Sequence, residues 1–288
     1  MNQATAPQMS IPAEADRETR ASPAGGCPLH GMLVPLTSGG VVARTLVIAY
    51  GLIAYAIFFV TFLYAIGFVT GLVVPKTVSS GQAAPLLLAM AINGSLLGAF
   101  ALQHTIMSRG WFKRWITRII PEAIERSTFV LASSLILAAT FAFWQPMPDV
   151  LLQAPGPISS AVLTGISLLG FGIVLYSSFL INHFDLFGLR QVAAHFVGRR
   201  YHAVPFRLNS LYRVVRHPLM FGFLVAFWIT PTLTVGHLFF ALMTTGYILV
   251  GVAIEERDLI DSFGDEYREY KVRVRGLVPL PVLKRGSK

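Results

Sequence analysis

The chain has 288 residues, of which 54% are hydrophobic and 13% are charged, and it carries a net charge of +9. This share of apolar residues lies well above the average for soluble globular domains and excludes an ordinary soluble enzyme. No nucleic-acid-binding motif accompanies the positive charge, so we expect no nucleic-acid partner and assign the excess of Lys and Arg to contacts with membrane lipid.

The first 40 residues are rich in Ala, Pro, Gly and Ser and show no hydrophobic periodicity. This composition is typical of disorder, and residues 1–43 are predicted to form a disordered cytoplasmic tail. They lack the basic start and the short apolar core of a signal peptide. The only cysteine, Cys27, has His30 as a neighbour, but one such pair without further ligands predicts a solvated tail and no metal site.

Uncharged apolar segments follow in chain order, at residues 45–71, 83–107, 128–144, 158–181, 219–230 and 235–254. A transmembrane helix needs about 20 such residues to cross about 30 Å of hydrocarbon. The sequence therefore predicts an all-α polytopic membrane protein with five to six transmembrane helices.

The last two apolar segments are predicted to form a helical hairpin over residues 218–254. The 12 residues of 219–230 reach only about 18 Å as a helix, so this first arm is short, re-entrant or extended by residues 210–217. Pro231 is expected to end it, and residues 235–254 are long enough to return across the membrane.

Positive charge is concentrated in two of the loops between these segments. Residues 108–127 carry five basic and two acidic side chains, and residues 182–217 carry six arginines and one aspartate, Asp185. Because loops rich in Lys and Arg stay in the cytoplasm, both termini and both basic loops are expected there. The protein is thus predicted to be an integral protein of a bacterial inner membrane.

Residues Glu255–Val274 combine dense charge with apolar side chains at helical spacing, which predicts a cytosolic amphipathic helix bent at Gly264. Glu255 and Glu256 lie where the second arm of the hairpin ends, and negative charge there opposes the helix dipole. The hairpin brings them level with a basic cluster, which consists of Arg213, Arg216 and His217. We expect the two groups to face each other across the mouth of a pocket.

The two sides of this pocket suit a ligand with both kinds of charge. The cations and the helix start at Pro218 suit a carboxylate, and the glutamates suit an ammonium, a sulfonium or ribose hydroxyls. Aromatic faces for a base or a cation are offered by Tyr212, Phe221, Phe263 and Tyr267. S-adenosylmethionine carries all of these groups. From composition alone, a salt-bridge network that only closes the hairpin is about as well supported as a ligand pocket.

A two-part C-terminal motif resembles a known family. Its members are Tyr212, Val215, Arg216, His217, Pro218 and Gly222, followed by Glu255, Glu256, Leu259, Phe263, Gly264, Tyr267, Tyr270 and Pro279. The pattern is similar to the signature of the isoprenylcysteine carboxyl methyltransferase superfamily, with Met220 where that family has tyrosine. The resemblance implies an integral membrane methyltransferase that binds S-adenosylmethionine, and releases S-adenosylhomocysteine, in a cytosolic pocket without a Rossmann domain.

The resemblance also implies how the domain and its site are arranged. Residues 44–288 would form a single membrane methyltransferase domain, and residues 182–280 would be its cofactor-binding part. The charges and aromatic faces at the hairpin mouth, together with the resemblance, predict the cofactor-binding residues Tyr212, Arg213, Arg216, His217, Pro218, Gly222, Glu255, Glu256, Phe263 and Tyr267.

Three upstream stretches narrow the resemblance, at residues 59–81, 102–131 and 181–192. They are similar to the branch that contains the methanethiol S-methyltransferases and the NnrU-type membrane proteins. The former imply methyl transfer from S-adenosylmethionine to methanethiol, a small thiol, with release of dimethyl sulfide. Another small or lipophilic thiol, or an NnrU-type protein linked to denitrification, is the alternative, and the oligomeric state is left open.

Methyl transfer to a thiol needs a thiolate, and an alkanethiol binds its proton more tightly than a cysteine side chain does. Ionising it near neutral pH costs at least about 2 kcal/mol, so a general base is expected. The favoured catalytic pair is His183 and Asp185, and His104 is a further candidate whose alternative role is structural. Asp185 could instead pair with Arg190 or Arg216.

Two other classes of protein are rivals to an enzyme. A transporter would place polar residues or broken helices near the middle of the membrane, where this chain offers Asn93 as its clearest buried amide. A structural membrane protein would use the basic cluster only as a lipid anchor.

Overall fold

The computed structural model describes residues 40–202 and 210–279, so the predictions on residues 1–39, including Cys27 and His30, lie outside the described residues. Five long helices dominate the described part: α1 (Val41–Thr70), α2 (Leu86–Ser108), α4 (Glu122–Phe143), α5 (Pro157–Ile181) and α9 (Val235–Phe263). Each is long and apolar enough to cross a membrane, which confirms the all-α polytopic membrane fold. The first turn of α1 lies within the predicted tail.

Glycine, proline and threonine set the ends of these helices. Gly71 ends α1 in a left-handed conformation, with φ 78°, and its N–H donates to the carbonyl oxygen of Gly67. Pro157 opens α5 at a position where no intrahelical N–H bond is lost. Thr234 caps α9 by accepting a hydrogen bond of 3.1 Å from the backbone N–H of His237.

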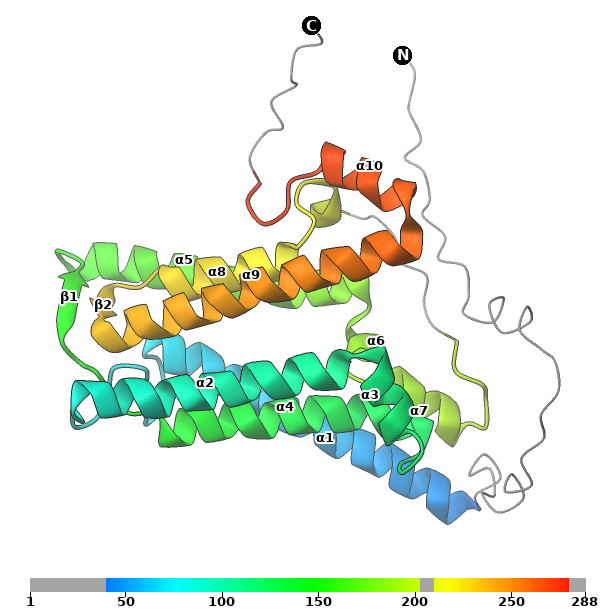
Figure 1. Ribbon diagram of the computed structural model, residues 1–288. Helices are drawn as coiled ribbons and strands as arrows, with labels where there is room; N and C mark the ends of the chain where they lie inside the picture. Colours follow the sequence, from blue (N-terminus) through cyan, green and yellow to red (C-terminus); the bar gives the residue numbers. More distant parts are fainter. Residues whose placement is uncertain (1–39, 203–209, 280–288) are drawn as a thin grey trace, which may run out of the picture.

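The predicted hairpin is formed by α9 and the shorter helix α8 (Pro218–Trp228). The 11 residues of α8 cover only about 16 Å. The chain then continues to strand β2 (Thr232–Thr234), which pairs antiparallel with β1 (Val150–Gln153) at what we call the strand end of the bundle (Figure 1). Residues 210–217 contain the short 3₁₀ helix η4 (Ser210–Arg213) and do not continue α8 as an α-helix, so the first arm is short as a helix.

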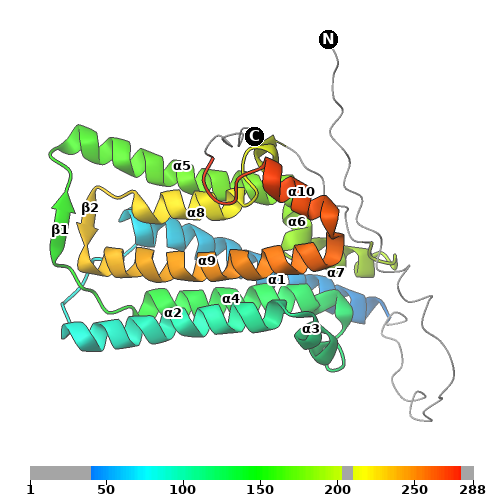
Figure 2. The same ribbon diagram turned by 45° about the horizontal axis from the view of Figure 1, so that its top comes forward.

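Helix α8 packs closely along α5 (Figure 2). Gly170 and Gly222 face each other at this contact, because a Cβ on Gly222 would lie 2.7 Å from the carbonyl oxygen of Gly170. Ser167 of α5 adds a hydrogen bond of 2.8 Å from its Oγ to the carbonyl oxygen of Ala226. Small residues thus let the two backbones approach, and an interhelical hydrogen bond secures them.

An apolar core lies toward the strand end and includes Phe68, Phe141, Trp144, Phe171 and Phe240. Trp144 is fully buried, and its Nε1 donates to the carbonyl oxygen of Val78 over 3.0 Å. Asn93 is also fully buried and exchanges two hydrogen bonds with the backbone of Gln145. This buried amide therefore has a structural role, unlike the polar residue that a transporter would use for its substrate.

The opposite end of the bundle carries short helices, namely α3 (Gly110–Ile116), α6 (His183–Leu186), α7 (Leu189–Phe196) and α10 (Asp265–Arg273). Helix α10 turns back from the end of α9 (Figure 1). Gly264 separates these two helices with φ 59°, a left-handed angle that favours glycine. The predicted bend at Gly264 is confirmed.

Candidate functional site

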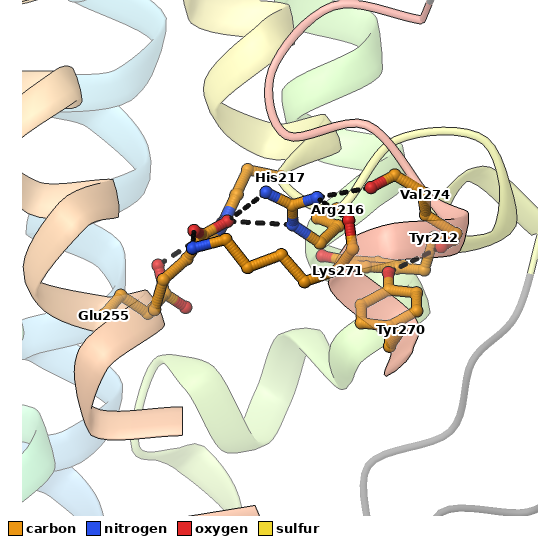
Figure 3. Close-up of polar contacts among 8 residues, drawn as sticks. Tyr212, Arg216, His217, Glu255, Tyr270, Lys271 and Val274 are labelled. Carbon is orange, nitrogen blue, oxygen red and sulfur yellow. Dashed lines mark hydrogen bonds and ion pairs between the residues drawn. The ribbon is translucent and has the colours of Figure 1, made fainter. Parts of the chain in front are cut away.

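Four side chains from three segments meet at the end opposite the strands, and we call them the ion cluster: Arg216, His217, Glu256 and Lys271 (Figure 3). Glu256 is its centre. Its Oε1 accepts from Arg216 Nη2 at 2.6 Å and from His217 Nε2 at 3.2 Å, and its Oε2 lies 2.7 Å from Lys271 Nζ. The side chains of Arg216 and Glu256 are only 9% and 10% exposed, so their pairing is largely shielded from water.

Backbone hydrogen bonds join the segment that carries Arg216 and His217 to the chain after α10. The N–H groups of Arg216 and His217 donate to the carbonyl oxygens of Arg275, at 2.8 Å, and Gly276, at 3.1 Å. The guanidinium of Arg216 also donates through Nη1 to the carbonyl oxygen of Lys271 over 3.0 Å. Since Arg275 and Gly276 follow α10, the chain after α10 lies beside the segment that leads into α8.

Aromatic side chains close the ion cluster on the side of α10. Tyr267 and Tyr270 are buried and pack with Phe263. The hydroxyl of Tyr270 donates to the carbonyl oxygen of Tyr212 over 2.6 Å (Figure 3). Burial, and then the charge of Glu256, raises the pKa of Tyr267 to about 12, and burial also raises the pKa values of Tyr212 and Tyr270. These phenols stay protonated at neutral pH, and Phe263 packs against the buried rings of α10.

Several charged groups at the rim of the ion cluster are open to solvent. The side chain of Glu255 is 53% exposed, and its Oε2 lies 3.5 Å from His217 Nδ1. The side chain of Lys271 is 43% exposed, and Arg213 is exposed as well. Exposed groups change partners at lower cost than buried ones do, so these are the side chains that a ligand can engage first.

Pro218 and Gly222 belong to α8, just after the ion cluster. Pro218 is buried at the first helical position. Gly222 is buried too, but its Cα faces α5, where an added Cβ would lie 2.9 Å from the backbone nitrogen of Val174. The structure gives Gly222 a role in helix packing, and its contact with a cofactor stays a prediction.

The formal charges of the site match a ligand that carries both signs. Arg216 and Lys271 contribute two positive charges, and Glu255 and Glu256 contribute two negative ones, when His217 is counted as neutral. The salt-bridge network that was the alternative to a ligand pocket is thus formed. A zwitterion can exchange partners with such a network and leave no buried charge unpaired. This set of donors and acceptors fits the amino-acid part of S-adenosylmethionine.

A second polar group, which we call the histidine cluster, consists of Tyr55, Ser178, Phe179, His183 and Phe187. His183 Nε2 lies 2.9 Å from the hydroxyl oxygen of Tyr55, and Nδ1 lies 2.8 Å from Ser178 Oγ. The ring of Phe179 stacks on the imidazole with 4.3 Å between centroids. His183 is 3% exposed, and burial lowers its pKa, so the imidazole is neutral at neutral pH.

Asp185 lies two residues after His183 but contacts other partners. Its Oδ1 accepts a hydrogen bond of 2.6 Å from the hydroxyl of Tyr201 and lies 3.6 Å from Arg190 Nη1. The predicted pair of His183 and Asp185 is not formed, because each nitrogen of the imidazole already has another partner. The alternative pairing with Arg190 is the one that the described residues show.

His104 lies on α2 and contacts α4. Its Nδ1 is 3.3 Å from Ser133 Oγ, and its ring lies 5.4 Å from the ring of Phe100 and 4.8 Å from that of Phe129, between centroids. One hydrogen bond between helices and three aromatic contacts, the third with Tyr247 of α9, agree with the structural alternative.

Sequence analysis missed Lys271, Tyr55 and Ser178. Lys271 lies 15 positions after Glu256, and the break at Gly264 stands between them, so helical spacing cannot place the two side chains together. Tyr55 and Ser178 stand in apolar segments, where one signal was available: a hydroxyl within a membrane segment needs a hydrogen-bonding partner.

Comparison with curated proteins gives close relatives over most of the chain. Methanethiol S-methyltransferase 1 of Bradyrhizobium diazoefficiens is 49% identical over 245 residues, which cover 85% of this chain and 86% of the relative. The methanethiol S-methyltransferase of Mycobacterium tuberculosis is 50% identical over 238 residues, 83% of this chain and 98% of the relative. Nurim of Sus scrofa is 31% identical over 189 residues, 60% and 69% respectively. No protein-family model and no solved structure matches the chain.

Proposed function

The chain belongs to the methanethiol S-methyltransferase family, and we propose that it transfers a methyl group to methanethiol, which yields dimethyl sulfide. It is an integral membrane enzyme, and five of its described helices are long and apolar enough to cross a membrane. The observation that carries this function is an identity of 49% and 50% with two methanethiol S-methyltransferases over more than four fifths of both chains.

S-adenosylmethionine is the proposed methyl donor, because the ion cluster offers partners for both charges of its amino acid. The carboxylate would bind beside Arg216, His217 and the α8 N-terminus at Pro218, where backbone N–H groups and the helix dipole favour an anion. The ammonium would bind beside the exposed Glu255, while Glu256 keeps the guanidinium of Arg216 in place. When bound, this donor supplies an electrophilic methyl group on a positively charged sulfur.

Methanethiol reacts as a thiolate, and His183 is the proposed acceptor of its proton. Burial keeps this imidazole neutral and therefore able to take up a proton. The acceptor offers one methyl group and one sulfur, so we propose a small apolar cavity, with Met220 in its wall. Since each additional buried methylene is worth about 0.8 kcal/mol, such a cavity must exclude longer thiols by shape.

We further propose that the ion cluster faces the cytosol, with both termini on that side of a bacterial inner membrane. Residues 108–127 and 182–217 carry 11 of the 23 Lys and Arg residues, and the helices α3, α6 and α7 within these two ranges lie at the same end of the bundle as α10 (Figure 1). Loops rich in Lys and Arg are retained in the cytoplasm, where a soluble, charged methyl donor would reach the site.

The proposed function is tested with purified protein in detergent, supplied with methanethiol and with S-adenosylmethionine that carries a labelled methyl group. Headspace gas chromatography should detect labelled dimethyl sulfide only when both substrates and the protein are present. A prenylated cysteine serves as the second acceptor, and the small cavity predicts no product from it. Donor binding without dimethyl sulfide would contradict the acceptor, and equal turnover of both thiols would contradict the small cavity.

A further inference from the structure

Given the methyl transfer to methanethiol proposed above, we infer that Tyr55 is a catalytic residue. Its phenol oxygen takes the proton of the thiol, while its own proton passes to His183 Nε2, 2.9 Å away. Tyr55 lies on α1, outside the C-terminal motif, and His183 follows α5, so the two come together only through the packing of α1, α5 and α6.

The direction of the hydrogen bonds in the histidine cluster follows from the number of protons available. Ser178 has one hydroxyl proton, which it donates to the carbonyl oxygen of Leu175 over 2.6 Å. Its Oγ can therefore only accept from His183, so the proton of the neutral imidazole is on Nδ1. Nε2 is then an acceptor, and the hydroxyl of Tyr55 must donate to it. The ground state thus already has the proton of Tyr55 directed at the base.

Access to the histidine cluster makes Tyr55 the residue that meets the thiol. His183 is 3% exposed, and both of its nitrogens are engaged. The ring of Phe179 covers one face at 4.3 Å, nearly parallel at 10°, and the ring of Phe187 lies 4.7 Å away. Tyr55, in contrast, is only partly buried. A thiol therefore transfers its proton to the imidazole through the Tyr55 oxygen.

The surroundings of His183 favour only a short-lived protonation of its imidazole. Its ring contacts from α1, α5, α6 and the residue after α6 are Tyr55, Phe179, Phe184 and Phe187, none of which carries a charge at neutral pH. Aromatic rings attract the imidazolium that forms. Burial without a carboxylate partner favours its return to the neutral form, which resets the base after each turnover.

The complete step balances in atoms and electrons. The S–H bond of methanethiol breaks, its proton binds the Tyr55 oxygen, and the former Tyr55 proton binds His183 Nε2. A lone pair of the thiolate sulfur forms the new S–CH₃ bond, and the bond between the methyl carbon and the donor sulfur breaks with its electron pair left on that sulfur. The proton on His183 returns to Tyr55, whose other proton leaves to water, so each turnover releases one proton.

The histidine cluster lies at the same end of the bundle as the ion cluster. Ser178 and Phe179 belong to the last turn of α5, and the hydroxyl of Tyr176 lies 3.4 Å from Ser210 Oγ of η4, which leads into Arg216. Both views place α6 and α10 at the end away from the strands (Figure 1, Figure 2). A donor held by the ion cluster and a thiol at Tyr55 would therefore occupy the same end.

The test compares Tyr55→Phe with Tyr50→Phe. Tyr50 lies five residues earlier on α1, is also partly buried, and bonds the hydroxyl of Thr128 at 3.0 Å. Tyr55→Phe should lower kcat near neutral pH by about 10²- to 10⁴-fold, the usual effect of losing an acid–base group. Its rate should then recover by about tenfold per pH unit as solution supplies thiolate. Tyr50→Phe should stay within about twofold of the parent protein.

Different results would overturn different proposals. A parent protein that makes no dimethyl sulfide contradicts the proposed function. An active parent with an equally active Tyr55→Phe contradicts the relay, as does a defect that alkaline pH does not relieve while donor binding is unchanged. Should Tyr55→Phe fail to accumulate in folded form, His183→Gln takes its place, and the relay predicts the same recovery with pH.

Discussion

The ion cluster and the histidine cluster stabilise their buried polar groups in different ways. In the ion cluster, one carboxylate, Glu256, is surrounded by three donors from two other segments, and full charges compensate one another. In the histidine cluster, His183 is held by two hydroxyls and by aromatic rings without any ion pair. A compensated charge holds its partners in fixed positions, which suits binding, whereas a neutral chain of hydrogen bonds can move a proton, which suits chemistry.

One contact between helices connects the two clusters. α8 begins directly after Arg216 and His217, and α5 ends with Ser178 and the segment that leads to His183. Because α5 and α8 touch at Gly170 and Gly222, we expect this contact to set the spacing between the two groups.

Glu256→Ala should give the largest effect, because it leaves Arg216 and Lys271 without their common partner. Breaking a buried ion pair on one side costs about 3–5 kcal/mol, and we expect this loss in the free energy of unfolding, measured by chemical denaturation in detergent. Asp265→Ala is the control, since its pair with Arg268 is exposed and worth at most about 1 kcal/mol. An equal loss of unfolding free energy in both variants would show that the buried ion cluster contributes no more than an exposed ion pair.

Gly222→Ala should disturb the spacing between the clusters. Its Cβ would meet the backbone of Gly170 and Val174 at 2.7–2.9 Å, and overpacking of this kind costs about 1–3 kcal/mol of unfolding free energy. The rate at saturating donor should fall too, because α8 moves relative to α5. Gly246→Ala on α9, where nothing lies within 4 Å, is the matched control and should leave both quantities unchanged. A harmless Gly222→Ala would show that the spacing is not set here.

Ser178→Ala should affect the histidine cluster alone. It removes the acceptor that fixes the proton on Nδ1, and one hydrogen bond is worth about 0.5–1.5 kcal/mol, so kcat should fall about 2- to 13-fold with donor affinity unchanged. Ser177→Ala provides the control on the adjacent residue, which is equally buried and whose hydroxyl has no partner in the described ranges 40–202 and 210–279. The same fall in kcat for both serines would rule out a specific role of Ser178.

Alkaline pH should weaken the ion-cluster end. Burial and Glu256 raise the pKa of Tyr267 to about 12, above its value of about 10 in the unfolded chain. A raised pKa stabilises the fold fully below about pH 10, and this contribution is lost as pH rises through 12. The unfolding free energy should fall over this range, and less steeply in Tyr267→Phe. Identical slopes would contradict the burial of this phenol.

Most of the fold follows from hydropathy alone. The predicted segment 158–181 corresponds to α5 (Pro157–Ile181), and 83–107 corresponds to α2 (Leu86–Ser108), because uncharged runs of this length have few alternatives in a membrane. The strands β1 and β2 could not be predicted. They have four and three residues, and their pairing depends on which loops meet after the helices have packed.

The part of the site that the hairpin of α8 and α9 forms could be predicted from the sequence. Arg216 and His217 meet Glu256 as the geometry of two adjacent arms predicts. The pair of His183 and Asp185 failed for a local reason: residues two apart on a helical turn project to different sides. The phenol of Tyr55 comes from a helix more than 100 residues away, and no spacing rule connects the two.

The position of Lys271, Arg275 and Gly276 in the chain has a consequence for biosynthesis. Arg216, His217 and Glu256 leave the ribosome first. Lys271, which pairs with Glu256, and the two carbonyls that accept from the backbone of Arg216 and His217 are translated only after all five long helices. Until the segment beyond Gly264 has been made, the ion pair of Arg216 and Glu256 in a nascent chain lacks its third charged partner, Lys271. The ion cluster is therefore complete only once the chain after α10 has been translated.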